Sequence, residues 1–197
     1  MRRVCFVFAR APRLGTVKRR LARDIGDRAA LRFHKGTAES LLRDLARDRR
    51  FTTRLAVTPE GARWRVPVPM VGQGRGDIGA RMHRACARVP RGVVVIVGSD
   101  IPGVGARQVA AAFRALGRAD AVFGPALDGG YWLVGMGPRR PARPFAGVRW
   151  STEHALAGTL ANFRGRRVAF LPMMRDVDTA EDLRAIMTPS GAPATAA

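Results

Sequence analysis

The chain has 197 residues, 47% of them hydrophobic, so it can bury one sizeable core and is short for two ordinary domains. Its apolar runs, such as residues 93–97, are far too short to span a membrane, and the first residues lead into a strand pattern instead of a cleavable signal. The net charge of +20 comes from arginines spread through every segment without interleaved aromatic rings, which argues against nucleic acid as the main partner. We expect one cytoplasmic domain at 1–187, a disordered tail at 188–197 and a preference for phosphorylated small molecules.

Apolar patterns in the first half of the chain predict alternating strands and helices. A buried strand at 4–9 is followed by helical spacing at 17–25 and 28–45, and then by a strand at 51–57. The extended segment 66–71 contains two prolines, which suits the edge of a sheet or a partly irregular strand. A helix is expected at 77–89 with Asp77 as its N-cap, and the unbroken apolar run 93–97 predicts a strand buried on both faces.

The second half continues the alternation. A helix is expected at 105–116, a strand at 121–124, a further apolar stretch at 131–136 after a glycine-rich turn, a loop at 139–147, a helix at 152–163, a strand at 167–171 and a helix at 179–186. This order predicts an α/β fold, a three-layer sandwich with a mainly parallel central sheet. In such folds ligands bind beyond the carboxyl ends of the strands, which directs attention to the loops that follow them.

The loop after the first strand has the composition of a phosphate site. Arg10, Lys18 and Arg20 bring positive charge to the strand end, and Gly15 lets a ligand approach the backbone near the start of a helix. The segment is neither a Walker A sequence nor a GxGxxG fingerprint. The alternative is a basic helix start that faces solvent.

Carboxylates follow the central strand and precede the last helix. Asp100 comes directly after 93–97, where it could hold a divalent cation against phosphate oxygens, or instead cap the next helix or form a turn. Asp176 and Asp178 are two apart on an extended segment and should point the same way, so Asp178 could complete a metal site with Asp100. Thr179 with Asp182 also resembles a capping box, and both interpretations of this segment can hold together.

The turn at 124–132 combines paired glycines, the carboxylate of Asp128 and aromatic rings, which suits either a substrate pocket or a hairpin turn. His34 and His83 lie in amphipathic helices, where surface or packing roles are expected, and His154 is a weak acid/base candidate. The residues that we assign to a substrate pocket from this turn and from the segment near 150 are Gly129, Gly130, Tyr131, Trp150 and Ser151.

Six motifs in the same order give the chain a resemblance to a bacterial family of glycosyltransferase-A-like proteins, the transferases associated with radical-SAM/selenodomain proteins. The motifs are FARAP with GTVKRRL (8–12 and 15–21), QGRGDIGARM (73–82), GSDIP (98–102), GPALDGGY (124–131), WST (150–152) and DVDTAEDL (176–183). The resemblance covers residues 6–183, with departures at Arg19, Ile101 and Ala180, where the family usually has Thr, Ser and Pro. It implies a nucleotide-diphospho-sugar transferase fold, with the first loop on the nucleotide and Asp100 near the metal.

Two enzymatic hypotheses follow. In a glycosyltransferase, Asp100 and Asp178 would hold Mg²⁺ or Mn²⁺ on a sugar nucleotide, and Lys18 with the loop arginines would stabilise the leaving nucleoside diphosphate. Asp128 or a residue beside Trp150 would orient the hydroxyl of a small acceptor. In a nucleotidyltransferase, the same residues would bind a nucleoside triphosphate, and pyrophosphate would leave as a small phosphorylated substrate attacks. Gln73 and Asp77 are assigned to the base or ribose in either case. The third hypothesis is a non-catalytic polyanion-binding protein; the oligomeric state stays open.

Overall fold

The computed structural model describes residues 1–187 and has one seven-stranded sheet with the strand order β3-β2-β1-β4-β6-β5-β7. The strands are β1 (Arg3–Arg10), β2 (Thr52–Thr58), β3 (Met70–Gly72), β4 (Val93–Gly98), β5 (Ala121–Pro125), β6 (Tyr131–Met136) and β7 (Val168–Phe170). All pairings among the described residues are parallel except those of β6, which runs antiparallel between β4 and β5. The predicted mainly parallel sheet is therefore confirmed.

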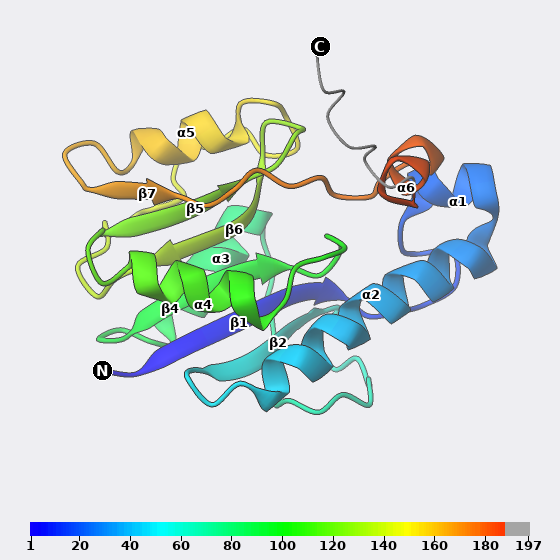
Figure 1. The fold of residues 1–197 in the computed structure, drawn as a ribbon, viewed down its shortest axis with the longest axis horizontal. Helices are drawn as coiled ribbons and strands as arrows, with labels where there is room; N and C mark the ends of the chain where they lie inside the picture. Colours follow the sequence, from blue (N-terminus) through cyan, green and yellow to red (C-terminus); the bar gives the residue numbers. More distant parts are fainter. Residues whose placement is uncertain (188–197) are drawn as a thin grey trace, which may run out of the picture.

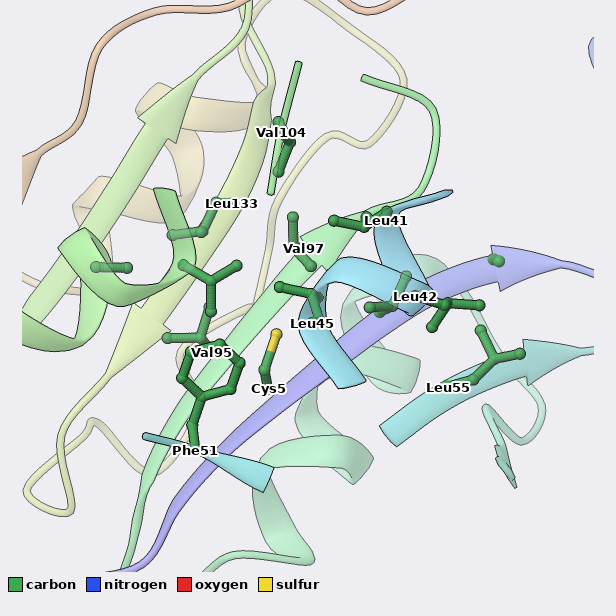
Figure 2. Close-up of a cluster of buried hydrophobic side chains, with 14 of the residues drawn as sticks. Cys5, Leu41, Leu42, Leu45, Phe51, Leu55, Val95, Val97, Val104 and Leu133 are labelled. Carbon is green, nitrogen blue, oxygen red and sulfur yellow. The ribbon is translucent and has the colours of Figure 1, made fainter. Parts of the chain in front are cut away.

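Helices cover both faces of the sheet, as Figure 1 shows. They are α1 (Arg19–Ile25), α2 (Asp27–Arg47), α3 (Ile78–Ala87), α4 (Ala106–Ala115), α5 (Ala155–Ala161) and α6 (Ala180–Met187). One hydrophobic cluster joins the sheet to α2 and α4 (Figure 2), and a second joins the opposite face to α3 and α5. These layers form the predicted three-layer sandwich.

Side chains alternate between the two clusters along the central strands. Cys5 and Val7 of β1 belong to the first cluster, whereas Val4 and Phe6 belong to the second. The same alternation runs through β4, whose Val95 packs beneath α2 and α4 (Figure 2). Burial on both faces explains the unbroken apolar sequences of these strands. Because β1 and β4 are parallel neighbours, their carboxyl ends lie at the same edge of the sheet.

Three predicted boundaries were wrong. The first helix begins at Arg19 instead of residue 17, because the backbone of Lys18 is left-handed, with φ 45°. Helix α5 begins at Ala155, after a turn in which Ser151 has φ 60°. Strand β3 keeps only three residues of the proline-containing segment, although it does lie at the sheet edge as predicted. The tail at 188–197 lies outside the described residues.

The last helix returns to the start of the chain. Helices α1 and α6 lie side by side beyond the carboxyl end of β1 (Figure 1). A small cluster joins them through Leu21 and Val177, and Asp24 accepts a hydrogen bond from the backbone N–H of Ala180 at 3.2 Å. This packing brings the first loop and the segment before α6 to the same sheet edge as the end of β4.

Candidate active site

One lysine joins two carboxylates at this edge. Lys18 Nζ lies 2.7 Å from Asp100 Oδ2 and 2.7 Å from Asp178 Oδ1, and only 6% of the lysine side chain is exposed. Burial by itself lowers the pKa of Lys18, but the charges and hydrogen bonds of the two carboxylates outweigh that effect, so the pKa is raised. The lysine is therefore held as a cation between the two predicted metal ligands.

Asp100 is not a helix cap. Gly105 is the N-cap of α4, and the first backbone N–H of that helix donates to Asp44 Oδ2 at 2.6 Å. The end of β4 leaves Asp100 half-buried, with its carboxylate free of helix capping and directed toward Lys18. The helix-cap alternative for Asp100 is therefore wrong, and its role as a site carboxylate stays a prediction.

The segment before α6 combines both roles considered from the sequence. Asp182 Oδ2 accepts hydrogen bonds from the backbone N–H groups of Asp178 and Thr179, at 3.1 and 3.0 Å, and from the Thr179 hydroxyl at 2.8 Å. The Thr179 hydroxyl in turn accepts from the N–H of Asp182 at 3.2 Å. This reciprocal capping box holds the backbone that presents Asp178 to Lys18.

The donor chemistry of Asp100 and Asp178 fits a hard divalent cation. Mg²⁺ is commonly held by one or two carboxylates together with substrate phosphates and water. Among residues 1–187 no group of three or more His, Cys, Asp or Glu side chains is arranged to hold a metal ion by itself. A metal at this pair would therefore complete its coordination with ligand oxygens, and it would have to displace the Lys18 ammonium that lies between the carboxylates.

A cavity of about 370 Å³, called here the basic cavity, opens beside β1 and β2. Its charged and polar lining includes Arg10, Lys18, His34, Gln73, Arg81, Asp100 and Asp178. The predicted residues Gly15, Arg20 and Asp77 do not line it. Gly15 lies in an exposed turn, Arg20 is 76% exposed with Nη1 3.9 Å from Asp178 Oδ2, and Asp77 caps α3 by accepting from the N–H of Ala80 at 2.7 Å.

Gln73 is buried in the basic cavity and its amide nitrogen is already engaged. Nε2 donates to the carbonyl oxygens of Ala9 at 3.2 Å and Ala56 at 2.8 Å, which links the ends of β1 and β2. Its Oε1 faces Arg81 Nη1 at 3.5 Å. A ligand in this cavity would meet the amide oxygen of Gln73 and the Arg81 guanidinium before it met the amide nitrogen.

Sequence reasoning missed His34 and Arg81. His34 is 5% exposed, and its Nε2–H donates to the carbonyl oxygen of Arg10 at 2.8 Å. Burial lowers its pKa below the ordinary value. The helical pattern of α2 does not reveal which strand end the helix covers. Arg81 lies within the motif at 73–82, which could have singled it out among the 33 arginines, but the motif does not show which cavity its side chain lines. The structure places both against the predicted phosphate loop.

A second cavity of about 400 Å³, called here the aromatic cavity, adjoins the first; both include Phe8, Ile78 and Asp100 in their walls. The residues that line this cavity and not the basic one include Asp128, Gly130, Tyr131, Trp132, Trp150, Ser151 and Asp176. The predicted pocket residues are thus brought together, apart from Gly129, which belongs to the turn but does not line the cavity. A Cβ at Gly129 would collide with the carbonyl oxygen of Glu153, so the turn and the segment before α5 pack too closely for a side chain.

The glycine-rich turn is both a hairpin and part of a pocket wall. It connects β5 to the antiparallel β6, and Asp128 Oδ1 accepts a hydrogen bond from the N–H of Gly130 at 2.8 Å. Asp176 also lines the aromatic cavity, whereas Asp178 lines the basic one, so these two carboxylates do not face a single cavity as expected. Burial, followed by the charges of Asp178, Asp128 and Asp100, raises the pKa of Asp176 to about 6.

Solved structures share this fold. A protein from Desulfovibrio desulfuricans G20, described as a candidate nucleotide-diphospho-sugar transferase, is similar with a TM-score of 0.90 and 29% identity over 98% of this chain and 90% of that one. A manganese complex of Rv0371c from Mycobacterium tuberculosis H37Rv has a TM-score of 0.57 and 20% identity, covering 94% of this chain and 98% of that one. The 4-diphosphocytidyl-2C-methyl-D-erythritol synthase of Anaerococcus prevotii DSM 20548 has a TM-score of 0.60 and 9% identity, covering 93% and 95%. The latter two show likeness of fold alone.

The sequence comparisons place the chain in a family. No curated protein matches it significantly. Within residues 1–187, no helix is both long and apolar enough to cross a membrane. A family described as "uncharacterized protein conserved in bacteria" (DUF2064) matches residues 41–152, which is more than half of the chain and includes the end of β4 and the turn before β6. The chain belongs to the DUF2064 family.

Proposed function

We propose that this protein is a metal-dependent glycosyltransferase that uses a nucleotide-diphospho-sugar donor. The observation that carries the proposal is that the half-buried carboxylate of Asp100 lies where a basic cavity and an aromatic cavity meet. Group transfer needs a donor and an acceptor held on either side of one reacting centre. The likeness to the Desulfovibrio protein supports the donor class. The narrower resemblance to radical-SAM/selenodomain-associated transferases stays a prediction, as does a cytoplasmic location.

The basic cavity suits the donor. Arg10, Lys18 and Arg81 supply positive charge and hydrogen-bond donors for a diphosphate, and Arg20 adds charge beside Asp178. A bound divalent cation held by Asp100 and Asp178 would supply Lewis-acid stabilisation of the leaving diphosphate. Lys18, displaced from between the carboxylates, would then donate to a phosphate oxygen.

The aromatic cavity suits the acceptor. Transfer breaks the bond between the anomeric carbon and the diphosphate oxygen and forms a bond from that carbon to an acceptor hydroxyl oxygen. The hydroxyl proton must pass to a base, for which we propose Asp128, an exposed carboxylate on this cavity wall. The nucleoside diphosphate leaves from the basic cavity, where the cations offset its additional negative charge.

Nucleotidyl transfer is the second candidate. The cations of the basic cavity would equally hold the β- and γ-phosphates of a nucleoside triphosphate, and this reaction needs little acid/base chemistry. The fold is also that of the Anaerococcus cytidylyl-type synthase. The two reactions differ in their products, because glycosyl transfer releases a nucleoside diphosphate and nucleotidyl transfer releases pyrophosphate.

Product analysis of the purified protein tests the proposal. Sugar nucleotides and nucleoside triphosphates are incubated with Mg²⁺ or Mn²⁺, and nucleoside diphosphate and pyrophosphate are measured separately. We expect metal-dependent release of nucleoside diphosphate, lost in Asp100→Asn and kept in Glu181→Gln, an exposed carboxylate on α6. Release of pyrophosphate alone would replace the proposal with the second candidate. Polyanion binding without turnover, unaffected by Asp100→Ala, would support the non-catalytic hypothesis.

A further inference from the structure

The lining of the aromatic cavity differs in charge from the rest of the molecule. Its described walls contain the carboxylates of Asp100, Asp128 and Asp176 and no lysine, arginine or histidine, in a chain that has 35 basic residues and a net charge of +20. The adjoining basic cavity contains Arg10 and Arg81. Positive charge is thus absent from the side of Asp100 that faces away from the phosphate loop.

The polar ends of the aromatic rings are directed away from this cavity. Trp132 Nε1 donates to the carbonyl oxygen of Pro172 at 3.3 Å, and the Tyr131 hydroxyl accepts from Thr159 Oγ1 at 3.3 Å. Trp150 packs against Gly79 of α3, where an added Cβ would lie 2.6 Å from the indole Cζ2. The rings therefore offer apolar surface, on which the C–H face of a sugar or polyol can pack.

The remaining polar groups are mostly hydrogen-bond acceptors. Ionised carboxylates only accept, so Asp128 and Asp176 require donors from the ligand. Two donors of the wall are already used: the Thr152 hydroxyl donates to the carbonyl oxygen of Arg149 at 2.8 Å, and the N–H of Gly130 donates to Asp128. The exposed Ser151 hydroxyl is left as a donor for the ligand. A phosphate or carboxylate would find like charge and few donors there.

We propose that the acceptor is a polyhydroxylated compound, a sugar glycoside or polyol, that carries no phosphate or carboxylate group. This inference rests on the proposed function and names the acceptor class of the same site. Hydroxyl groups of the ligand donate to the wall carboxylates, and its C–H face lies on the rings. The like charge of the wall excludes phosphorylated counterparts, so the two cavities separate an anionic donor from an uncharged acceptor.

Matched acceptor pairs test the inference: methyl glucoside against glucose 6-phosphate, and glycerol against glycerol 3-phosphate. Release of nucleoside diphosphate is measured above donor hydrolysis, and binding is followed separately by tryptophan fluorescence. We expect the neutral member of at least one pair to stimulate release at least tenfold more than its phosphorylated partner. Thr152→Arg adds a cation to the wall of the aromatic cavity and should lower the ratio of release with the neutral acceptor to release with the phosphorylated one. Ser40→Arg, on an exposed part of α2, should leave this ratio unchanged.

Different results would overturn the acceptor inference and the proposed glycosyl transfer. Preference for the phosphorylated member, in release or in fluorescence, overturns the acceptor inference and leaves glycosyl transfer standing. A panel in which no neutral member binds or stimulates release also overturns it. Pyrophosphate release from nucleoside triphosphates without any turnover of sugar nucleotides overturns the proposed function, and the binding measurement still decides which charge class the aromatic cavity accepts.

Discussion

The ammonium of Lys18 lies 2.7 Å from the carboxylate of Asp100, in the position that a divalent cation would need to occupy. The lysine reaches this point because its left-handed backbone turns the chain just before α1. The same nitrogen contacts Asp178 at 2.7 Å, so the protein itself supplies a cation for the carboxylate pair. This arrangement makes Lys18 and a bound metal competitors for one position.

Replacement of Lys18 should separate metal binding from nucleotide binding. In Lys18→Met we expect Mn²⁺ affinity without nucleotide to rise at least tenfold, about 1.4 kcal/mol, because the competing ammonium is gone. Affinity for a nucleoside diphosphate should fall, because a phosphate contact is lost. Electron paramagnetic resonance of free Mn²⁺ and calorimetry measure the two affinities. Lys35→Met is the matched control, since its ammonium is exposed and pairs with Glu39 on α2. Unchanged or weaker Mn²⁺ binding in Lys18→Met would contradict the competition.

Asp182 should act on the metal site through the backbone that it caps. Asp182→Ala removes the acceptor of two N–H groups and one hydroxyl, so we expect a loss of about 1 kcal/mol of unfolding free energy and weaker metal-dependent nucleotide binding. Asp182→Glu should restore much of both, because Glu serves the same position in a capping box. Chemical denaturation and calorimetry provide the readouts. Glu181→Ala, exposed on the same helix, should change neither, and an equal effect there would argue against capping.

Two glycine-to-alanine substitutions should have opposite effects on stability. Gly79→Ala would place its Cβ 2.6 Å from the Trp150 ring, so we expect a loss of about 1–3 kcal/mol and weaker ligand binding in the aromatic cavity, with nucleotide binding unchanged. Gly36→Ala meets nothing within 4 Å on an exposed turn of α2 and should stabilise the protein by about 0.5–1 kcal/mol. Thermal denaturation compares them. Stabilisation by both would show that Trp150 yields without cost.

His34 should contribute to acid sensitivity. Burial lowers its pKa in the folded protein below the ordinary value of 6.5, so the unfolded chain takes up the proton first as the pH falls. The contribution of neutral His34 to the free energy of unfolding is complete above pH 6.5 and is lost as the pH falls below that value. In His34→Gln, whose amide can still donate to Arg10, we expect a smaller loss of unfolding free energy between pH 7.5 and 5.5. His83→Gln, exposed on α3, should keep the wild-type pH dependence; the same loss in all three proteins would exclude His34 as the cause.

Much of the local structure follows from neighbouring residues. The Asp77 cap, the Asp-Gly hairpin turn and the capping box of Thr179 and Asp182 each depend on contacts within a few residues. The unbroken apolar run of β4 is itself a local pattern that predicts burial on both faces. Such patterns were enough to predict the α/β class and the sheet edge where the predicted site residues lie, because parallel strands with intervening helices place their carboxyl ends together. They also predicted that Asp100 and Asp178 lie close together, and in the structure both carboxylates contact Lys18.

The roles inside the site were decided by the tertiary structure. That Lys18 occupies the position between the carboxylates depends on the docking of α6 against α1, and the contact of His34 with Arg10 depends on where α2 crosses the sheet. The separation of Asp176 from Asp178 depends on two cavities built from strands distant in the chain. The period of apolar residues in a helix or strand predicts which of its sides is buried. It does not predict which other segment packs against that side, because that depends on contacts between residues far apart in the chain.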